Sequence, residues 1–229
     1  KSILESLIHA GAENEVKVVV NSIHSEYLDK ENISKNLRQL DGIIVAPGFG
    51  QRGLDGKILA VEYARVNKIP FLGICLGMQM AVIEYARNVK KIRYANSTEI
   101  SEKCKDPVID LMTSQKEIIN KGGTMRLGAW DCEIEKNTKS YKSYKKQLIS
   151  ERHRHRYEFN NSYSDRIFDD KFIVAGSNPD TKLVEIVENI DHPWFVGVQF
   201  HPEYKSSVYN PHPIFVNFVK ASLKKYLNK

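Results

Sequence analysis

A cysteine with a glycine two residues away on each side has the setting that most favours chemistry in this sequence. Cys75 stands in FLGICLGMQ (71–79), between an apolar, strand-like run and a helix-like segment, with Gly73 and Gly77 flanking it. Such glycines let the backbone close a tight, strained turn that projects a nucleophile above a sheet. The start of a helix carries partial positive charge, which favours a thiolate. The pattern predicts a catalytic thiol, whereas an isolated cysteine would more often be a small buried side chain.

A histidine and a glutamate in QFHPE (199–203) are the predicted partners of this thiol. His201 and Glu203 follow the apolar run 195–198, so they lie at the carboxyl end of a buried strand, where α/β proteins keep their active sites. A thiol nucleophile needs a nearby base, which a third group usually orients. Pro202 stiffens the link and lets the carboxylate turn back onto the imidazole. Taken alone, the HPE tripeptide could equally consist of a loop histidine and a surface acid without a catalytic role.

Acyl transfer also builds negative charge on the attacked carbonyl oxygen, and backbone N–H groups can stabilise it. The N–H of Leu76, next to the nucleophile, is one candidate donor. A second is Gly48, in the glycine loop APGFG (46–50) that follows the apolar run 42–45. These two residues form the predicted oxyanion hole, although the loop glycines taken alone could simply make a turn.

The elements that must position these groups indicate an α/β fold. In the first half, continuous apolar runs alternate with amphipathic segments, which is typical of a mostly parallel central sheet with helices on both faces. Helices are expected near 3–8, 33–39, 57–67 and 77–88, and strands at 16–20, 42–45 and 71–74.

The second half reads differently, because strand-like segments follow one another with few helices between them. We expect extra antiparallel strands there and an irregular polar stretch over 90–121. The Lys-, Ser- and Tyr-rich stretch 136–146 has no useful periodicity, so it predicts an exposed loop. The expected strands are 125–135, 172–177, 183–188 and 195–199, followed by a closing helix over 213–227.

Composition limits the class of protein. The 229 residues, 41% of them apolar, can form one domain spanning 1–229 with a proper core. The net charge of +6 is scattered among 28 acids, so no nucleic-acid partner is expected, and the basic run RHRHR (152–156) is interpreted as solvated surface. Three cysteines without a CxxC pair indicate a reduced, cytoplasmic setting. No apolar run is long enough for a membrane span.

Together these motifs resemble the class I glutamine amidotransferases of the Cys-His-Glu type. Five more specific sequence strings, spread over nearly the whole chain, resemble the CTP synthase family. Two of them, RHRHRYE and GGTMRLG, are not features associated with other amidotransferases. The strings are FGQRG (49–53), NSTE (96–99), GGTMRLG (122–128), ERHRHRYEFNN (151–161) and HPWFVGVQFHPE (192–203).

The resemblance implies that L-glutamine is the substrate, held at its two ends by Glu99 and Arg156 while its amide faces the thiol. A carboxylate suits the ammonium group, and a guanidinium suits the carboxylate. A surface or nucleic-acid contact is the alternative for Arg156. Residues of the elbow helix and the glycine loop would line the same pocket: Gly48, Leu76, Gly77, Met78 and Gln79.

For the whole enzyme, the resemblance implies an amino-terminal synthetase domain of the same polypeptide that uses ATP-Mg and UTP, with GTP as activator, in a homo-oligomer. The glutaminase domain itself would need no cofactor or metal. Residue 1 falls where the family's first helix begins, so the chain is expected to be an excised domain that lacks the synthetase domain and the opening strand. A second departure is Pro47, which replaces a family glycine and cannot donate an N–H.

Three alternatives stay open. The chain could be another class I amidotransferase or a γ-glutamyl peptidase with the same elbow. It could also be a non-catalytic regulatory or assembly module that has kept the motifs. Nucleic-acid binding through the RHRHR run is the third, and it would weaken steeply with salt.

Overall fold

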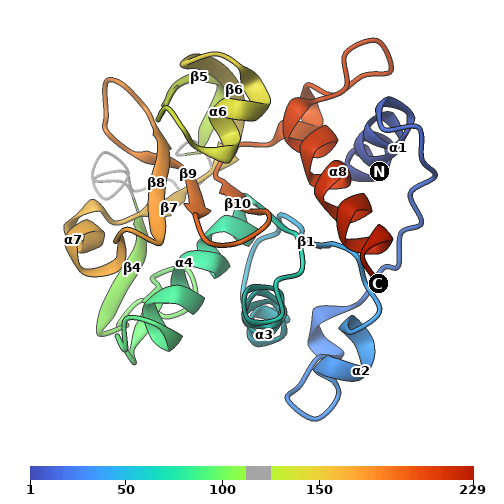
Figure 1. The fold of residues 1–229 in the computed structure, drawn as a ribbon. Helices are drawn as coiled ribbons and strands as arrows, with labels where there is room; N and C mark the ends of the chain where they lie inside the picture. The colour runs from blue at the N-terminus through green and yellow to red at the C-terminus, as the bar shows by residue number, and fades with distance from the viewer. Residues whose placement is uncertain (112–124) are drawn as a thin grey trace.

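The computed structural model of the protein describes residues 1–111 and 125–229 (Figure 1). Within these residues, seven strands form one sheet in the order β1-β2-β10-β9-β8-β5-β6. The strands are β1 (Ile43–Val45), β2 (Phe71–Ile74), β5 (Arg126–Ile134), β6 (Leu148–His155), β8 (Phe172–Ser177), β9 (Val184–Asn189) and β10 (Phe195–Val198).

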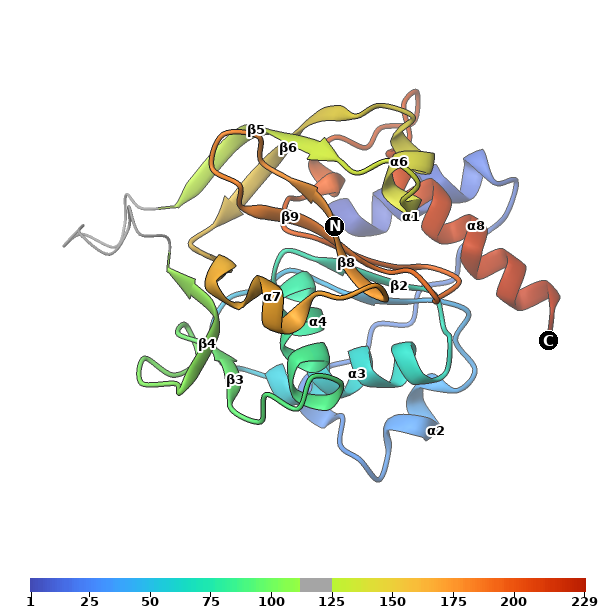
Figure 2. The same cartoon turned by 60° about the vertical axis from the view of Figure 1, so that its left-hand side comes forward.

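The parallel part of the sheet is β1, β2 and β10, with β2 in the middle. Every residue of β2 and β10 is buried, because helices cover both faces of this region. The helices α3 (Leu54–Val66) and α4 (Leu76–Asn88) pack on one face, and α1 (Ser2–Glu13) and α8 (Pro213–Leu227) on the other, as Figures 1 and 2 show. The predicted α/β class with helices on both faces is confirmed.

Parallel pairing does not, however, dominate the sheet among the described residues, so the expectation of a mostly parallel sheet is wrong in that respect. The pairs β10–β9, β9–β8, β8–β5 and β5–β6 are all antiparallel. Parallel neighbours need a long crossover, usually a helix, whereas short connections give antiparallel pairs. The second half has short connections between most of its strands, and the antiparallel strands predicted there are confirmed.

A second sheet of three strands was not predicted from the sequence. It consists of β3 (Ala95–Ser97), β4 (Asp106–Leu111) and β7 (Tyr157–Phe159), with β4 in the middle. Two of its strands fall in the stretch 90–121 that was expected to be irregular. Residues 112–124, which include the start of the GGTMRLG string, lie outside the described part of the chain.

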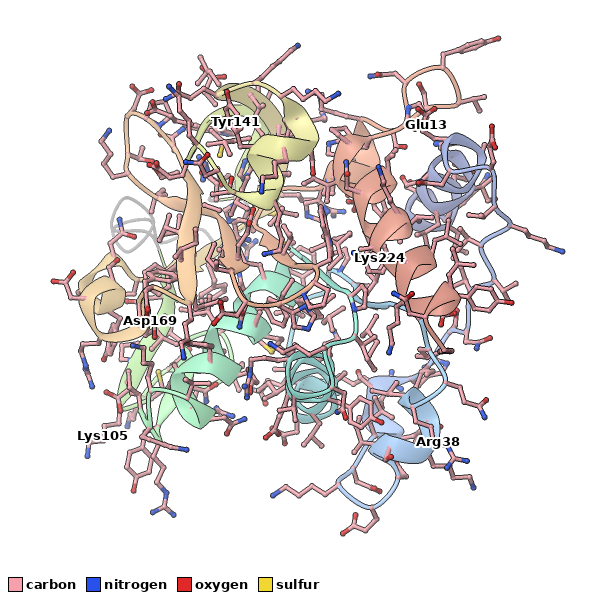
Figure 3. The ribbon with its side chains drawn as sticks, in the orientation of Figure 1. Glu13, Arg38, Lys105, Tyr141, Asp169 and Lys224 are labelled. Atoms are coloured by element: carbon pink, nitrogen blue, oxygen red, sulfur yellow. The ribbon has the colours of Figure 1, made fainter. Side chains whose placement is uncertain are left out.

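Two local expectations are wrong. The segment 16–20 forms no strand, since no strand of the described chain pairs with it, and Val19 is 76% exposed. The stretch 136–146 is not an exposed loop but contains α6 (Lys139–Tyr144), whose N-terminus is capped by the side chain of Thr138. Figure 3 shows Tyr141 projecting from this helix.

The remaining elements are short helices that join these parts. They are η1 (Ser25–Tyr27), α2 (Ile33–Leu37), η3 (Asn161–Tyr163), α7 (Ser164–Ile167) and η4 (Pro202–Tyr204). Across residues 1–111 and 125–229, none of the helices has both the length and the apolar character that a bilayer crossing requires.

Candidate active site

The turn at Cys75 has the predicted strand–turn–helix geometry. The strand β2 ends at Ile74, α4 begins at Leu76, and Cys75 between them adopts φ 53° and ψ −104°, a conformation that non-glycine residues rarely take. A Cβ at Gly73 would come within 2.7 Å of the Gly77 backbone, and one at Gly77 would overlap the carbonyl oxygen of Val45. Both glycines are therefore required by close backbone approach.

His201 and Glu203 form a buried pair at the end of β10. The imidazole Nδ1 lies 2.8 Å from the Glu203 Oε1, and the two residues are only 4% and 7% exposed. This contact makes Nδ1 the protonated nitrogen and leaves Nε2 as the acceptor. Nε2 has no hydrogen-bond partner among the described residues. The imidazole is thus in the tautomer that a general base requires.

Pairing of β10 with β2 brings the two motifs together. The backbone N–H of Cys75 donates to the Val198 carbonyl over 2.7 Å, at the end of β10. The next residue, Gln199, places its Nε2 3.7 Å from the Cys75 Sγ. Its Oε1 accepts from Gln79 Nε2 over 3.2 Å. The thiol and the His–Glu pair therefore lie at one edge of the sheet, although more than half of the chain separates them.

Protonation of the thiol differs from the expectation. Burial, with a smaller contribution from the nearby carboxylates of Glu203 and Glu99, raises the pKa of Cys75 to about 12. The Leu76 backbone N–H and the Gln199 side chain oppose this shift but do not cancel it. Because desolvation outweighs the helix N-terminus here, the resting residue is a thiol at neutral pH, and a base must take its proton.

A cavity of about 310 Å³ opens in front of the thiol. Six of the predicted site residues line it: Cys75, Gly48, Leu76, Gln79, Glu99 and Arg156. The other four do not: Gly77 and Met78 are buried in the first turn of α4, and His201 and Glu203 are buried at the end of β10. Five lining residues were not singled out from the sequence: Phe49, Met125, Arg154, His155 and Tyr157.

Opposite charges face this cavity. The Glu99 Oε1 accepts from the backbone N–H of Gly50 over 2.9 Å, which ties the carboxylate to the glycine loop. Arg156 follows β6, and its buried Nε has no partner among the described residues. A carboxylate and a guanidinium in one cavity match the two charged groups of a free amino acid.

The two predicted oxyanion donors lie side by side on the lining. A Cβ at Gly48 would be 3.3 Å from the Leu76 side chain and 3.3 Å from Lys57 Nζ. Lys57 was not identified as a site residue from the sequence. Burial lowers the pKa of its ammonium group. Gln199 was also overlooked as a contact of the thiol. For the residues that the structure describes, no group of three or more His, Cys, Asp or Glu side chains could hold a metal ion.

Comparison with known proteins agrees with this geometry. Residues 1–221 match the family model described as glutamine amidotransferase class-I. Proteins named CTP synthase from Christiangramia forsetii and Flavobacterium johnsoniae are each 61% identical over 97% of this chain. A solved structure described as Trypanosoma brucei CTPS, glutaminase domain with bound acivicin, superimposes with a TM-score of 0.91 at 38% identity, covering 97% of this chain and 87% of that one.

The chain therefore belongs to the class I glutamine amidotransferase family. Within that family it corresponds to the glutaminase domain of CTP synthases, which its relatives by sequence and by structure share. It spans only 41–42% of the length of those two bacterial relatives.

Proposed function

We propose that residues 1–229 are the glutaminase domain of a longer CTP synthase and hydrolyse L-glutamine to glutamate and ammonia. The observation that carries this proposal is the cavity, which combines a thiol at a strained elbow with a carboxylate and a guanidinium for the two ends of an amino acid. The His201–Glu203 pair at the end of the adjacent strand supplies the base.

The reaction follows from these positions. His201 Nε2 takes the proton of Cys75, and the thiolate attacks the side-chain amide carbon of glutamine. The tetrahedral intermediate collapses as the imidazolium returns the proton to the departing nitrogen, which leaves as ammonia. A γ-glutamyl thioester remains, and water activated by His201 hydrolyses it to glutamate and free thiol. Glu203 keeps the imidazole in the required tautomer.

Backbone donors at Gly48 and Leu76 would stabilise the oxyanion in both halves of the reaction. Both residues line the cavity beside the thiol. The loss of one such donor costs on the order of 3 kcal/mol in other hydrolases. Pro47 removes one N–H from the loop, but Gly48 retains its own.

The ammonia would be used by the synthetase domain of the same polypeptide, which aminates UTP to CTP with ATP-Mg, with GTP as activator, in a homo-oligomer. Relatives named CTP synthase that are more than twice as long as this chain support a further domain. Three free cysteines fit a reducing compartment, so we propose a cytoplasmic location.

The test is glutamate release from glutamine, together with intact-mass analysis after treatment with a chloroketone analogue of glutamine. The Cys75→Ala variant should lose both signals, whereas Cys132→Ala, which removes another buried cysteine, should keep both. Labelling of Cys75 with little turnover would mean that the site is built but depends on the rest of the longer protein. Absence of both signals in the parent chain would favour a non-catalytic module.

A further inference from the structure

Five charged or titratable side chains are buried together behind one wall of the cavity. They come from β5, β6, β7 and β9, and each is at most 4% exposed: Arg126, His153, His155, Glu158 and Glu185. Two of them are the histidines of the RHRHR run, whose neighbours Arg152 and Arg154 are exposed. Burial of so many ionisable groups is costly unless they satisfy one another.

Four of these side chains form a linear series. Glu185 Oε2 lies 3.5 Å from His153 Nε2, and His153 Nδ1 lies 2.8 Å from His155 Nε2. His155 Nδ1 in turn lies 3.7 Å from Glu158 Oε1. The series therefore has a carboxyl group at each end and two imidazoles between them. Arg126 Nη1 reaches both ends, at 2.7 Å from Glu185 Oε1 and 3.4 Å from Glu158 Oε2.

The number of protons in this network follows from its charge balance. Of the three gaps only that between His153 and His155 has hydrogen-bond geometry, and the atoms that face each other in the two outer gaps have no hydrogen-bond partner among the described residues. Neutral imidazoles carry no charge, so Arg126 supplies one positive charge to the two carboxyl groups that it contacts. A second ionised carboxylate would be buried without a counter-charge, which is costly. One carboxyl group is therefore protonated, and the other is the carboxylate that Arg126 neutralises.

We propose that Arg126, His153, His155, Glu158 and Glu185 form a positioning network for the glutamine pocket, in which the two carboxyl groups share a single proton. The network then carries no net charge, which permits its burial. Its pKa shifts agree in direction: burial raises the pKa of Glu158 to about 8 and of Glu185 to about 7, and lowers that of His153 to about 2 and of His155 to about 3.

The network touches the site at three points. His155 lines the cavity, and Arg156 adjoins it. The backbone N–H of His201 donates to the Arg152 carbonyl on β6 over 2.8 Å. The backbone N–H of Gln199 donates to the Glu185 carbonyl over 2.8 Å. A shift of β6 relative to β9 would therefore move both the substrate arginine and the catalytic histidine.

Two single variants and their combination test the shared proton. Glutamine resembles a protonated glutamate, so E158Q or E185Q leaves one carboxylate for Arg126 and should lower the unfolding temperature by no more than about 4 °C. The double variant leaves Arg126 buried without an anion and should lose more than the sum of the two single shifts. The matched control is E84Q, since Glu84 is the carboxylate that contacts Arg65, at 2.6 Å, and its single loss should be costly.

The pH dependence gives a second readout. Between about pH 4.5 and 8 the folded carboxyl pair holds a proton that the unfolded chain releases, so its contribution to stability falls as pH rises. The two histidines act oppositely from about pH 3 to 6.5, where stability rises with pH. From about pH 6.5 to 8 the carboxyl pair should make stability fall as pH rises, and either single variant should weaken this fall. The groups that face the carboxyl pair are Arg126, His153 and His155, with Cys132 near Glu185, and His201 acts on the two histidines of the network.

A positioning role also requires a kinetic readout, and this part depends on the proposed glutaminase function. The single variants should keep the parent KM for glutamine. The double variant should show a raised KM with a smaller change in kcat. The parent chain above pH 8 should show the same change. The stability measurements need no turnover, so they decide on the shared proton even if the chain proves inactive. Additive losses in the double variant, or a single variant as damaging as E84Q, would overturn the proposal.

Discussion

Two walls of the same cavity are built in opposite ways. The wall around Cys75 is held by steric contact: Gly73 and Gly77 permit backbone approach that no side chain would allow, and the neighbouring strands are fully buried. The wall that carries His155 and Arg156 is held by buried hydrogen bonds and ion pairs. The first fixes the backbone at the thiol by steric fit, with Gln199 as a polar contact of the sulfur, whereas the second orients polar groups toward the cavity. Single substitutions in each wall can test whether steric packing stabilises the first wall and polar interactions stabilise the second.

The largest effect is expected from Gly77→Ala. The added methyl group would overlap the Val45 carbonyl oxygen, so the elbow must open, with a loss of roughly 3 kcal/mol or more of stability together with loss of glutaminase activity. The control is Gly128→Ala on β5, where φ is +83° but no atom lies within 4 Å; it should cost only about 1–2 kcal/mol. Urea unfolding of both variants measures the difference, and equal losses would contradict the steric account.

A smaller but specific effect is expected from Arg156→Lys. The variant keeps the charge but loses the planar fork that suits a carboxylate, so kcat/KM for glutamine should fall by about 10- to 100-fold, mainly through KM. Arg152→Lys, at an exposed position of β6, should leave both constants unchanged. Steady-state kinetics on both variants decides; a fall in kcat alone would assign Arg156 another role.

Alkylation of the free thiol tests the protonation state of the first wall. Because burial raises the pKa of Cys75 to about 12, its reaction with iodoacetamide in a Cys104→Ala, Cys132→Ala background should accelerate roughly tenfold per pH unit from pH 7 to 10. A rate that levels off near neutral pH would show a stable thiolate instead, and would restore the expectation from the helix N-terminus.

The smallest effect is expected at the cap of α6. The hydroxyl of Thr138 accepts from the Tyr141 N–H over 3.0 Å and donates to the Glu135 carbonyl over 2.7 Å. Thr138→Ala should cost about 1 kcal/mol in thermal unfolding, with unchanged kinetics. A change in KM would show that α6 communicates with the cavity more closely than its position indicates.

The difference between the walls also explains what could be predicted from the sequence. The elbow and the QFHPE segment were recognisable because each follows an uninterrupted apolar strand, and such strands pair within a parallel core. In β6 the alternation of exposed Arg152 and Arg154 with buried His153 and His155 is a period-two strand signal, but its positive charge led to an interpretation as solvated surface.

Other features depend on partners that are distant in the chain. The strands β4 and β7 pair although nearly 50 residues separate them, and no local sequence pattern predicts that pairing. The segment 16–20 shows the reverse case, since its β-branched residues favour a strand but no described strand lies beside it to form a ladder. The raised pKa of Cys75 likewise follows from burial by the whole fold rather than from the helix that begins beside it.

The measurement that tests the central claim most directly is acid quenching of the chain during reaction with glutamine, followed by intact-mass and peptide analysis. The account predicts a γ-glutamyl adduct on the peptide that contains Cys75. The adduct should be absent in Cys75→Ala and strongly reduced in His201→Asn, because the protonated thiol then lacks its base. Glutamate release that persists in Cys75→Ala, or an adduct on Cys104 or Cys132 instead, would contradict it.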